Sequence, residues 1–117
     1  MKIDNLHNKS FKVGNHIIYF KVIYDLVNKD EYLNDECYAC FCYWDNTIRI
    51  SMKYCSQVSV NTFKEILRHE ILHAYFYHSK VHPNKVPIDN EETIVEWIAQ
   101  KFPTISKTFN EVYDLLK

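Results

Sequence analysis

Glycine is almost absent from the chain, and proline and long apolar runs are scarce. One glycine and three prolines in 117 residues exclude a collagen-like or glycine-rich low-complexity protein. No stretch reaches the roughly 18 apolar residues that a membrane-spanning helix needs. Residues 1–10 are polar and lack the apolar segment of a secretory signal. We therefore expect a cytoplasmic protein that does not enter a membrane.

An excess of charge of one sign is also missing. The formal net charge is −1, so the sequence gives no electrostatic reason to expect direct binding to nucleic acid. Apolar residues, by contrast, make up 47% of the chain and include seven Phe, nine Tyr and two Trp. Charged residues make up 25%, which is the balance of a globular protein. The length fits a single domain over residues 1–117.

The four cysteines, Cys37, Cys40, Cys42 and Cys55, leave three interpretations open. Two disulfides would require an oxidising compartment, and the C-x-x-C spacing of Cys37 and Cys40 suits a structural zinc site. Against both, Cys40 and Cys42 lie two residues apart in a strand-like run and would share one face. Cys55 has no second cysteine at ligand spacing. We expect four reduced cysteines that pack as small apolar side chains.

The first half of the chain has the pattern of β-strands. Gly14-Asn15 is a turn signal between two runs rich in β-branched and aromatic residues. Asp45-Asn46 is a second turn signal. The predicted strands cover residues 11–13, 16–24, 37–44 and 47–52. We expect these strands to form a small, mainly antiparallel sheet.

The second half changes to a helical period. Ser59 or Asn61 is a suitable N-cap for a helix that ends near His78. Two prolines between residues 81 and 88 predict a loop after it.

A second helix is expected from a cap at Asp89 or Asn90 to Phe102, where Pro103 stops it. A third, amphipathic helix follows up to residue 116. A sheet followed by three helices is an α+β domain.

A metal-binding motif lies in the middle of the first helix. Residues 68–73 read Arg-His-Glu-Ile-Leu-His and contain the pattern H-E-x-x-H. Histidines four residues apart lie on one helical face, so His69 and His73 can reach one cation. Glu70 beside them can act as a general base towards a water molecule. Random placement of these residue types gives roughly 0.02 expected matches. A helix that merely carries surface histidines is therefore a poor explanation.

The third protein ligand that a catalytic zinc ion takes is open to several candidates. His78 points away from the first two histidines while the helix continues, and His82 lies in the loop. Glu92 and Glu96 are four residues apart on the second helix and share a face. We expect Glu92 to be the ligand and Glu96 to accept the free N–H of a ligand histidine. Glu96 itself, or a histidine, remains the alternative ligand.

The pattern H-E-x-x-H, then 18 residues, then Glu92 with Glu96 four further on, resembles the gluzincin metallopeptidases. The small size and the segment EETIVEWIA after RHEILHA are similar to ImmA/IrrE-type and related phage-encoded zinc peptidases. The resemblance covers residues 45–102. It implies a zincin-like fold with the metal site between the first two helices.

The same resemblance implies what the site residues do. His69, His73 and Glu92 would hold Zn2+, and Glu70 would be the catalytic base for peptide-bond hydrolysis. In zincins an edge strand before the active helix pairs with an extended substrate, and residues 47–52 are the matching segment here.

The predicted function is therefore zinc-dependent hydrolysis of peptide bonds in a protein or peptide substrate. One alternative is a catalytically silent zinc-binding regulatory or phage accessory protein, and another is a structural helical domain with a chance motif. No nucleic acid or membrane partner is expected. The sequence does not rank the candidates for an oxyanion-stabilising group, which are Tyr75, Tyr77, His78 and His82.

Overall fold

The computed structural model describes residues 1–24, 37–79 and 91–117, and of residues 91–93 the backbone alone. The strands are β1 (Ser10–Val13), β2 (His16–Ile23), β3 (Ala39–Cys42) and β4 (Thr47–Ser51). A 3-10 turn at Ile3–Leu6 precedes them, and helices α1 (Met52–Cys55), α2 (Val60–His78) and α3 (Glu91–Leu115) follow. The expected α+β class is confirmed.

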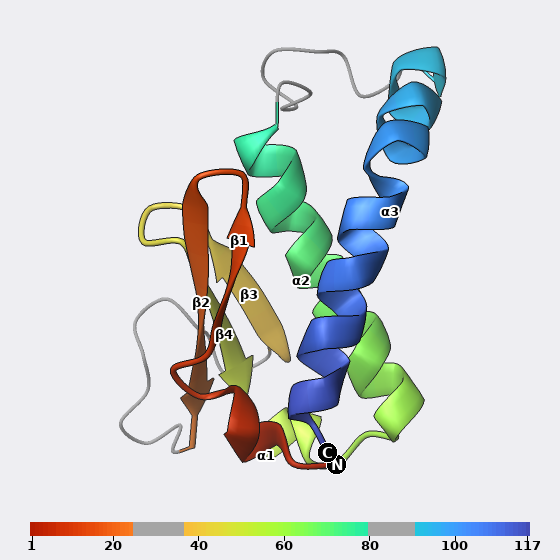
Figure 1. Cartoon of the computed structure of the whole chain (residues 1–117). Coiled ribbons are helices and arrows are strands. Elements are labelled where there is room, and N and C mark those ends of the chain that lie inside the picture. Colours follow the sequence, from red (N-terminus) through yellow and green to blue (C-terminus); the bar gives the residue numbers. More distant parts are fainter. Residues whose placement is uncertain (25–36, 80–90) are drawn as a thin grey trace.

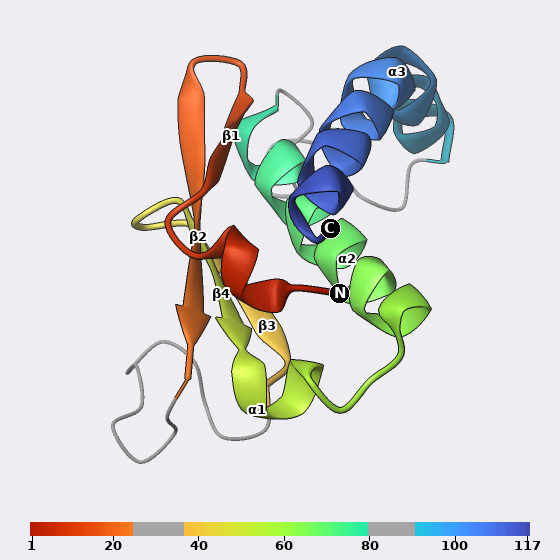
Figure 2. The same cartoon turned by 60° about the horizontal axis from the view of Figure 1, so that its bottom comes forward.

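The sheet and the two long helices form separate layers. Both α2 and α3 lie on the same face of the sheet (Figure 1), and α2 packs directly against β3. The view turned by 60° shows the same order of layers (Figure 2). The core between them is formed by Ile18, Phe20, Ile48 and Ile50 from the sheet, with the apolar face of α2 against them.

The sheet is mixed, with strand order β1-β2-β4-β3: of the pairs between the described strands, two are antiparallel, as expected, and one is parallel, which was not expected. Each hairpin is antiparallel as predicted, and Gly14 adopts φ +60 in the first turn. The hairpins are joined by the parallel pair β2–β4. These two strands carry the most completely buried apolar side chains, and pairing them places both in the centre of the sheet. Alternation along a strand does not reveal which strands become neighbours.

The segment that the resemblance matched to a substrate-pairing edge strand, residues 47–52, contains β4. All five residues of β4 (Thr47–Ser51) are buried, because β4 lies between β2 and β3. The assignment of residues 47–52 to an edge strand is therefore wrong. The edge strand beside α2 is β3.

Helix α2 begins where its cap predicts. The Ser59 hydroxyl accepts a hydrogen bond from the backbone N–H of Thr62 at 3.1 Å. Phe63, Leu67 and Ile71 then follow at three- to four-residue spacing and are fully buried. The helix ends at His78, as expected.

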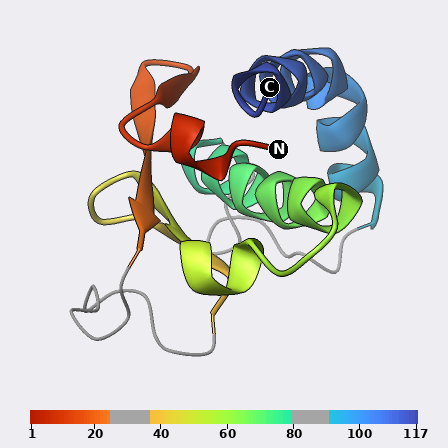
Figure 3. The same ribbon diagram turned by 90° about the horizontal axis from the view of Figure 1, so that it is seen from below.

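Helix α3 continues through Pro103, so the expected break into two helices is wrong. Trp97, Ile105 and Val112 keep one helical face buried on both sides of the proline. Pro103 and Ala99 are both exposed. Because proline has no backbone N–H, the Ala99 carbonyl has no helical donor. Water can hydrate that carbonyl, while the burial on either side favours one continuous element. The helix changes direction along its length (Figure 3).

Polar contacts fasten α3 to α2. The hydroxyls of Tyr75 and Thr108 are 2.7 Å apart, and the Arg68 guanidinium donates to the Tyr113 hydroxyl at 3.2 Å.

All four cysteines are free thiols. Among the described residues, none of the helices has the length and apolar character needed to cross a membrane.

Candidate metal centre

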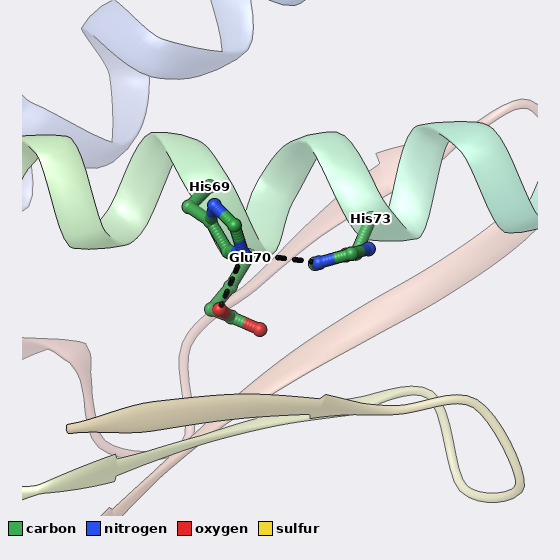
Figure 4. A group of neighbouring side chains, drawn as sticks. All are labelled: His69, Glu70 and His73. Carbon is green, nitrogen blue, oxygen red and sulfur yellow. Dashed lines mark hydrogen bonds and ion pairs between the residues drawn. The ribbon is translucent and has the colours of Figure 1, made fainter. Parts of the chain in front are cut away.

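The three residues of the H-E-x-x-H motif converge on one side of α2. His69, Glu70 and His73 project from the helix towards the β3–β4 side of the sheet (Figure 4). Each offers one ligand atom, and these atoms lie within 4.8 Å of one another. This group could hold a metal ion, as the spacing predicted.

The separation of the two imidazoles suits a shared cation. The Nε2 atoms of His69 and His73 are 3.1 Å apart. Two nitrogens that each bind a tetrahedral zinc ion at about 2.0–2.1 Å lie roughly 3.3 Å from one another. Two unprotonated nitrogens this close would direct their lone pairs at each other, so either one ring donates a proton to the other or a cation lies between them. The His69 side chain is 69% exposed, which leaves room for a further ligand.

Glu70 is held differently from the two histidines. The residue is buried, with a relative exposure of 8%, beside exposed imidazoles. The backbone N–H of Phe41 in β3 donates to Glu70 Oε1 at 2.9 Å. The other carboxylate oxygen, Oε2, lies 3.9 Å from His69 Nε2. One oxygen is thus fixed by the sheet edge while the other faces the space beside the histidine nitrogens.

Two hollows flank Glu70 where α2 packs against β3. A cavity of about 270 Å³ opens on the His73 side. A second cavity, of about 410 Å³, opens on the His69 side. Glu70 lines both, so the carboxylate lies between two spaces that follow the edge strand.

The Cys40 thiol also lines the cavity on the His73 side. Burial, together with the neighbouring Cys42 thiol and the Glu70 carboxylate, raises the pKa of Cys40 to about 12. Its Sγ lies 4.0 Å from Cys42 Sγ, so the two share one face of the strand as expected. In the metal-free chain Cys40 is a neutral thiol at pH 7.

The candidates for the third ligand are only partly placed. Glu92 is the second residue of α3, but its side chain lies outside the described residues, as does the whole of His82. Glu96 is exposed and its carboxylate accepts from Gln100 Nε2 at 3.4 Å. His78 is bound elsewhere, with its Nε2 2.6 Å from Asn46 Oδ1. In the described part of the chain, neither Glu96 nor His78 belongs to the metal-binding group.

The candidates for an oxyanion-stabilising group separate in the same way. The Tyr75 hydroxyl is occupied by Thr108 in the core, and His78 stacks on His16 with ring centroids 3.9 Å apart. Tyr77 is partly exposed and lines the cavity on the His73 side. Of the described candidates, Tyr77 alone lies beside the motif.

Two residues of the site escaped the sequence analysis. Phe41 and Tyr43 reach the motif only because β3 is the edge strand next to α2. The run Cys-Tyr-Ala-Cys-Phe-Cys-Tyr-Trp at residues 37–44 held a signal, since it is more aromatic than one buried strand face requires. The identity of its neighbours depends on the order of the strands, which local patterns do not encode.

Comparisons of the chain with protein-family models, with curated proteins and with solved structures found no significant match.

Proposed function

We propose that this protein is a zinc-dependent peptidase in which His69 and His73 bind the metal and Glu70 is the general base. The observation that carries the proposal is the convergence of two imidazole Nε2 atoms, 3.1 Å apart, beside a buried carboxylate. Imidazole and carboxylate ligands in tetrahedral arrangement suit zinc, which keeps an open position for water at catalytic sites. The two cavities along β3 give a peptide chain room on both sides of that point.

The chemistry divides between the metal and the carboxylate. When bound, zinc lowers the pKa of its water towards about 7 and polarises the carbonyl to be attacked. Glu70 Oε2 faces the histidine nitrogens and accepts the proton of the attacking water, then passes it to the leaving amine. The Phe41 N–H holds Oε1, so the carboxylate does not have to reorient between the two transfers.

The packing of α3 on α2 supports Glu92 as the third ligand. The rings of Trp97 and Phe76 stack with centroids 4.2 Å apart, and Phe76 lies three residues after His73. This stack places the second turn of α3 beside the turn of α2 that follows the motif. We propose that Glu92, in the first turn of α3, completes the ligand set and that Glu96 supports it from one turn further on.

A catalytically silent metal-binding protein is the second candidate. The hydrogen bond from the Phe41 N–H gives Glu70 a structural role that does not depend on hydrolysis. A protein that only binds metal would have a reason to keep the same glutamate.

The metal can be tested directly. Protein purified without added metal is expected to contain about one zinc per chain by elemental analysis. His69→Ala and Glu92→Ala are expected to lose it, while Glu91→Ala, the neighbouring acid, is the matched control and retains it. Protein that carries no transition metal and takes up none at micromolar zinc would refute the proposal. Loss of zinc in His82→Ala but not in Glu92→Ala would refute the ligand set alone.

A further inference from the structure

The cavity on the His73 side differs in its walls from the one on the His69 side. Four aromatic rings, those of Phe41, Tyr43, Phe76 and Tyr77, line the first cavity together with Cys40, Glu70 and His73. Its volume of about 270 Å³ is below the range of pockets that enclose a drug-sized molecule, so it suits a single side chain.

The aromatic walls come from three elements and are set at defined angles. Tyr43, in the β3–β4 turn, stacks on Tyr77 of α2 with centroids 5.2 Å apart and planes at 29°. Phe41 of β3 meets Tyr77 edge-on, with centroids 6.2 Å apart and planes at 61°. Tyr43 is 55% exposed, although it contacts Tyr77. Exposed aromatic surface beside a polar site is a feature of recognition surfaces rather than of a folding core.

The cavity on the His69 side has a more polar lining. Thr62 and the exposed Glu65 stand on its α2 wall, and Tyr38 on its strand wall. A peptide that runs between β3 and α2 therefore meets an aromatic pocket on one side of Glu70 and polar groups on the other.

We propose that the pocket lined by Phe41, Tyr43, Phe76 and Tyr77 binds an aromatic side chain of the substrate, next to the bond that is cleaved. The proposal rests on the peptidase function proposed above. Aromatic rings pack favourably against one another edge-to-face or offset-stacked, and the four walls offer both arrangements. Among the described residues that line the pocket, Glu70 and His73 belong to the proposed reaction site, and the remaining non-aromatic residue, Cys40, is a neutral thiol. An acidic side chain would meet the Glu70 carboxylate, which disfavours it.

Cleavage of an unfolded protein tests the preference without a known substrate. Zinc-loaded protein is incubated with reduced, carboxymethylated casein, and the cut positions are mapped by mass spectrometry. We expect Phe, Tyr and Trp on one side of the cut bonds about tenfold more often than their share of the casein sequence. Cleavage without this enrichment overturns the pocket proposal and leaves the peptidase function standing.

Variants at the mouth of the pocket assign the preference to its walls. Tyr43→Ala is expected to reduce the enrichment to near its background, and Tyr43→Phe to retain it because the ring remains. Tyr24→Ala is the matched control, because Tyr24 is exposed to a similar extent, at 53%, but does not line the pocket. Loss of the enrichment in Tyr24→Ala to the same degree as in Tyr43→Ala overturns the assignment.

A binding experiment separates the pocket from the chemistry. The Glu70→Gln protein is titrated with acetyl-Ala-Ala-Phe-Ala-Ala-amide and with the analogue that carries cyclohexylalanine in place of Phe. We expect the Phe peptide to bind roughly two- to tenfold more tightly than the saturated analogue of the same size, and Tyr43→Ala to abolish the difference. This result supports the pocket even if the wild-type protein cleaves nothing. Equal binding of the two peptides overturns it.

Discussion

The two carboxylate oxygens of Glu70 have different neighbours: Oε1 accepts a hydrogen bond from the Phe41 N–H, and Oε2 lies 3.9 Å from His69 Nε2. At the scale of single residues, the structural contact and the proposed acceptance of a proton therefore fall on different oxygens. Glutamine keeps an oxygen that can accept the Phe41 N–H but cannot accept a proton from water.

Glu70→Gln should therefore retain the fold and the metal and lose hydrolysis by roughly 10²–10⁴-fold, the usual contribution of a general base. Glu70→Ala should in addition lower the free energy of unfolding by about 1–3 kcal/mol, because the Phe41 N–H loses its acceptor. Elemental analysis, peptide cleavage and urea denaturation measure the three quantities. Undiminished cleavage by Glu70→Gln would exclude Glu70 as the base.

His78 carries a pH dependence of its own. Burial, and then the charge of the stacked His16, lower the pKa of His78 from its ordinary value of 6.5. As the pH falls through 6.5, the unfolded chain takes up a proton that the folded chain resists, so the fold loses stability in that range. Asn46, which faces the same ring, is uncharged and does not compensate.

The free energy of unfolding is therefore expected to fall between pH 7.5 and pH 5.5, and to fall less in His78→Gln. Urea denaturation in the presence of a chelator measures this without the pH dependence of metal binding. Equal pH slopes in the wild type and in His78→Gln would contradict the assignment.

At the scale of elements, helix α3 shows where local rules stop. A proline in a helix interior costs about 3 kcal/mol, and the sequence therefore predicted that the helix ends there. The structure continues it because Trp97, Ile105 and Val112 bury one face across the proline. Tertiary packing therefore outweighs the intrinsic preference of one residue.

Replacing Pro103 by alanine restores the N–H that the Ala99 carbonyl lacks. We expect Pro103→Ala to raise the free energy of unfolding by about 1–2 kcal/mol, after allowance for the greater entropy of the unfolded alanine chain. Thr104→Ala, at the exposed next position, is the control and should change stability by less than about 0.7 kcal/mol. A lower midpoint of thermal unfolding in Pro103→Ala would show that the proline shape itself is required.

The features predicted correctly share one property, which is that they depend on neighbours in sequence. Both hairpins and the start of α2 follow from turn and cap residues within a few positions. The placement of His69, Glu70 and His73 follows from helical spacing alone. The strand order, and with it the arrival of Phe41 and Tyr43 at the motif, depends on contacts between distant segments that no local pattern determines.

At the scale of the whole molecule, Cys55 reports on the integrity of the core. Its side chain is fully buried, its thiol donates to the Tyr38 carbonyl at 3.3 Å, and burial raises its pKa to about 12. Cys37, which is partly exposed, has no comparable shielding. The two thiols should therefore differ greatly in reactivity within the same molecule.

In native buffer at pH 8, iodoacetamide should modify Cys37 first and Cys55 at least roughly a thousandfold more slowly, because Cys55 must await global unfolding. Mass spectrometry of timed samples measures both rates, and added urea should raise the Cys55 rate in step with unfolding. Modification of both thiols at similar rates would mean that the segment around α1 opens independently of the core.

The parallel pairing of β2 with β4 also has a consequence for how the chain reaches its native state. The two hairpins close within a few residues, whereas Tyr19 pairs with Thr47 across 28 positions of sequence. Short loops close faster and at lower entropic cost than long ones, so each hairpin is expected to form before the two are joined. Until they join, β3 has no fixed position beside α2 and the Glu70 carboxylate has no edge strand to bind. The candidate site is therefore expected to be among the last parts of the molecule to assemble during folding.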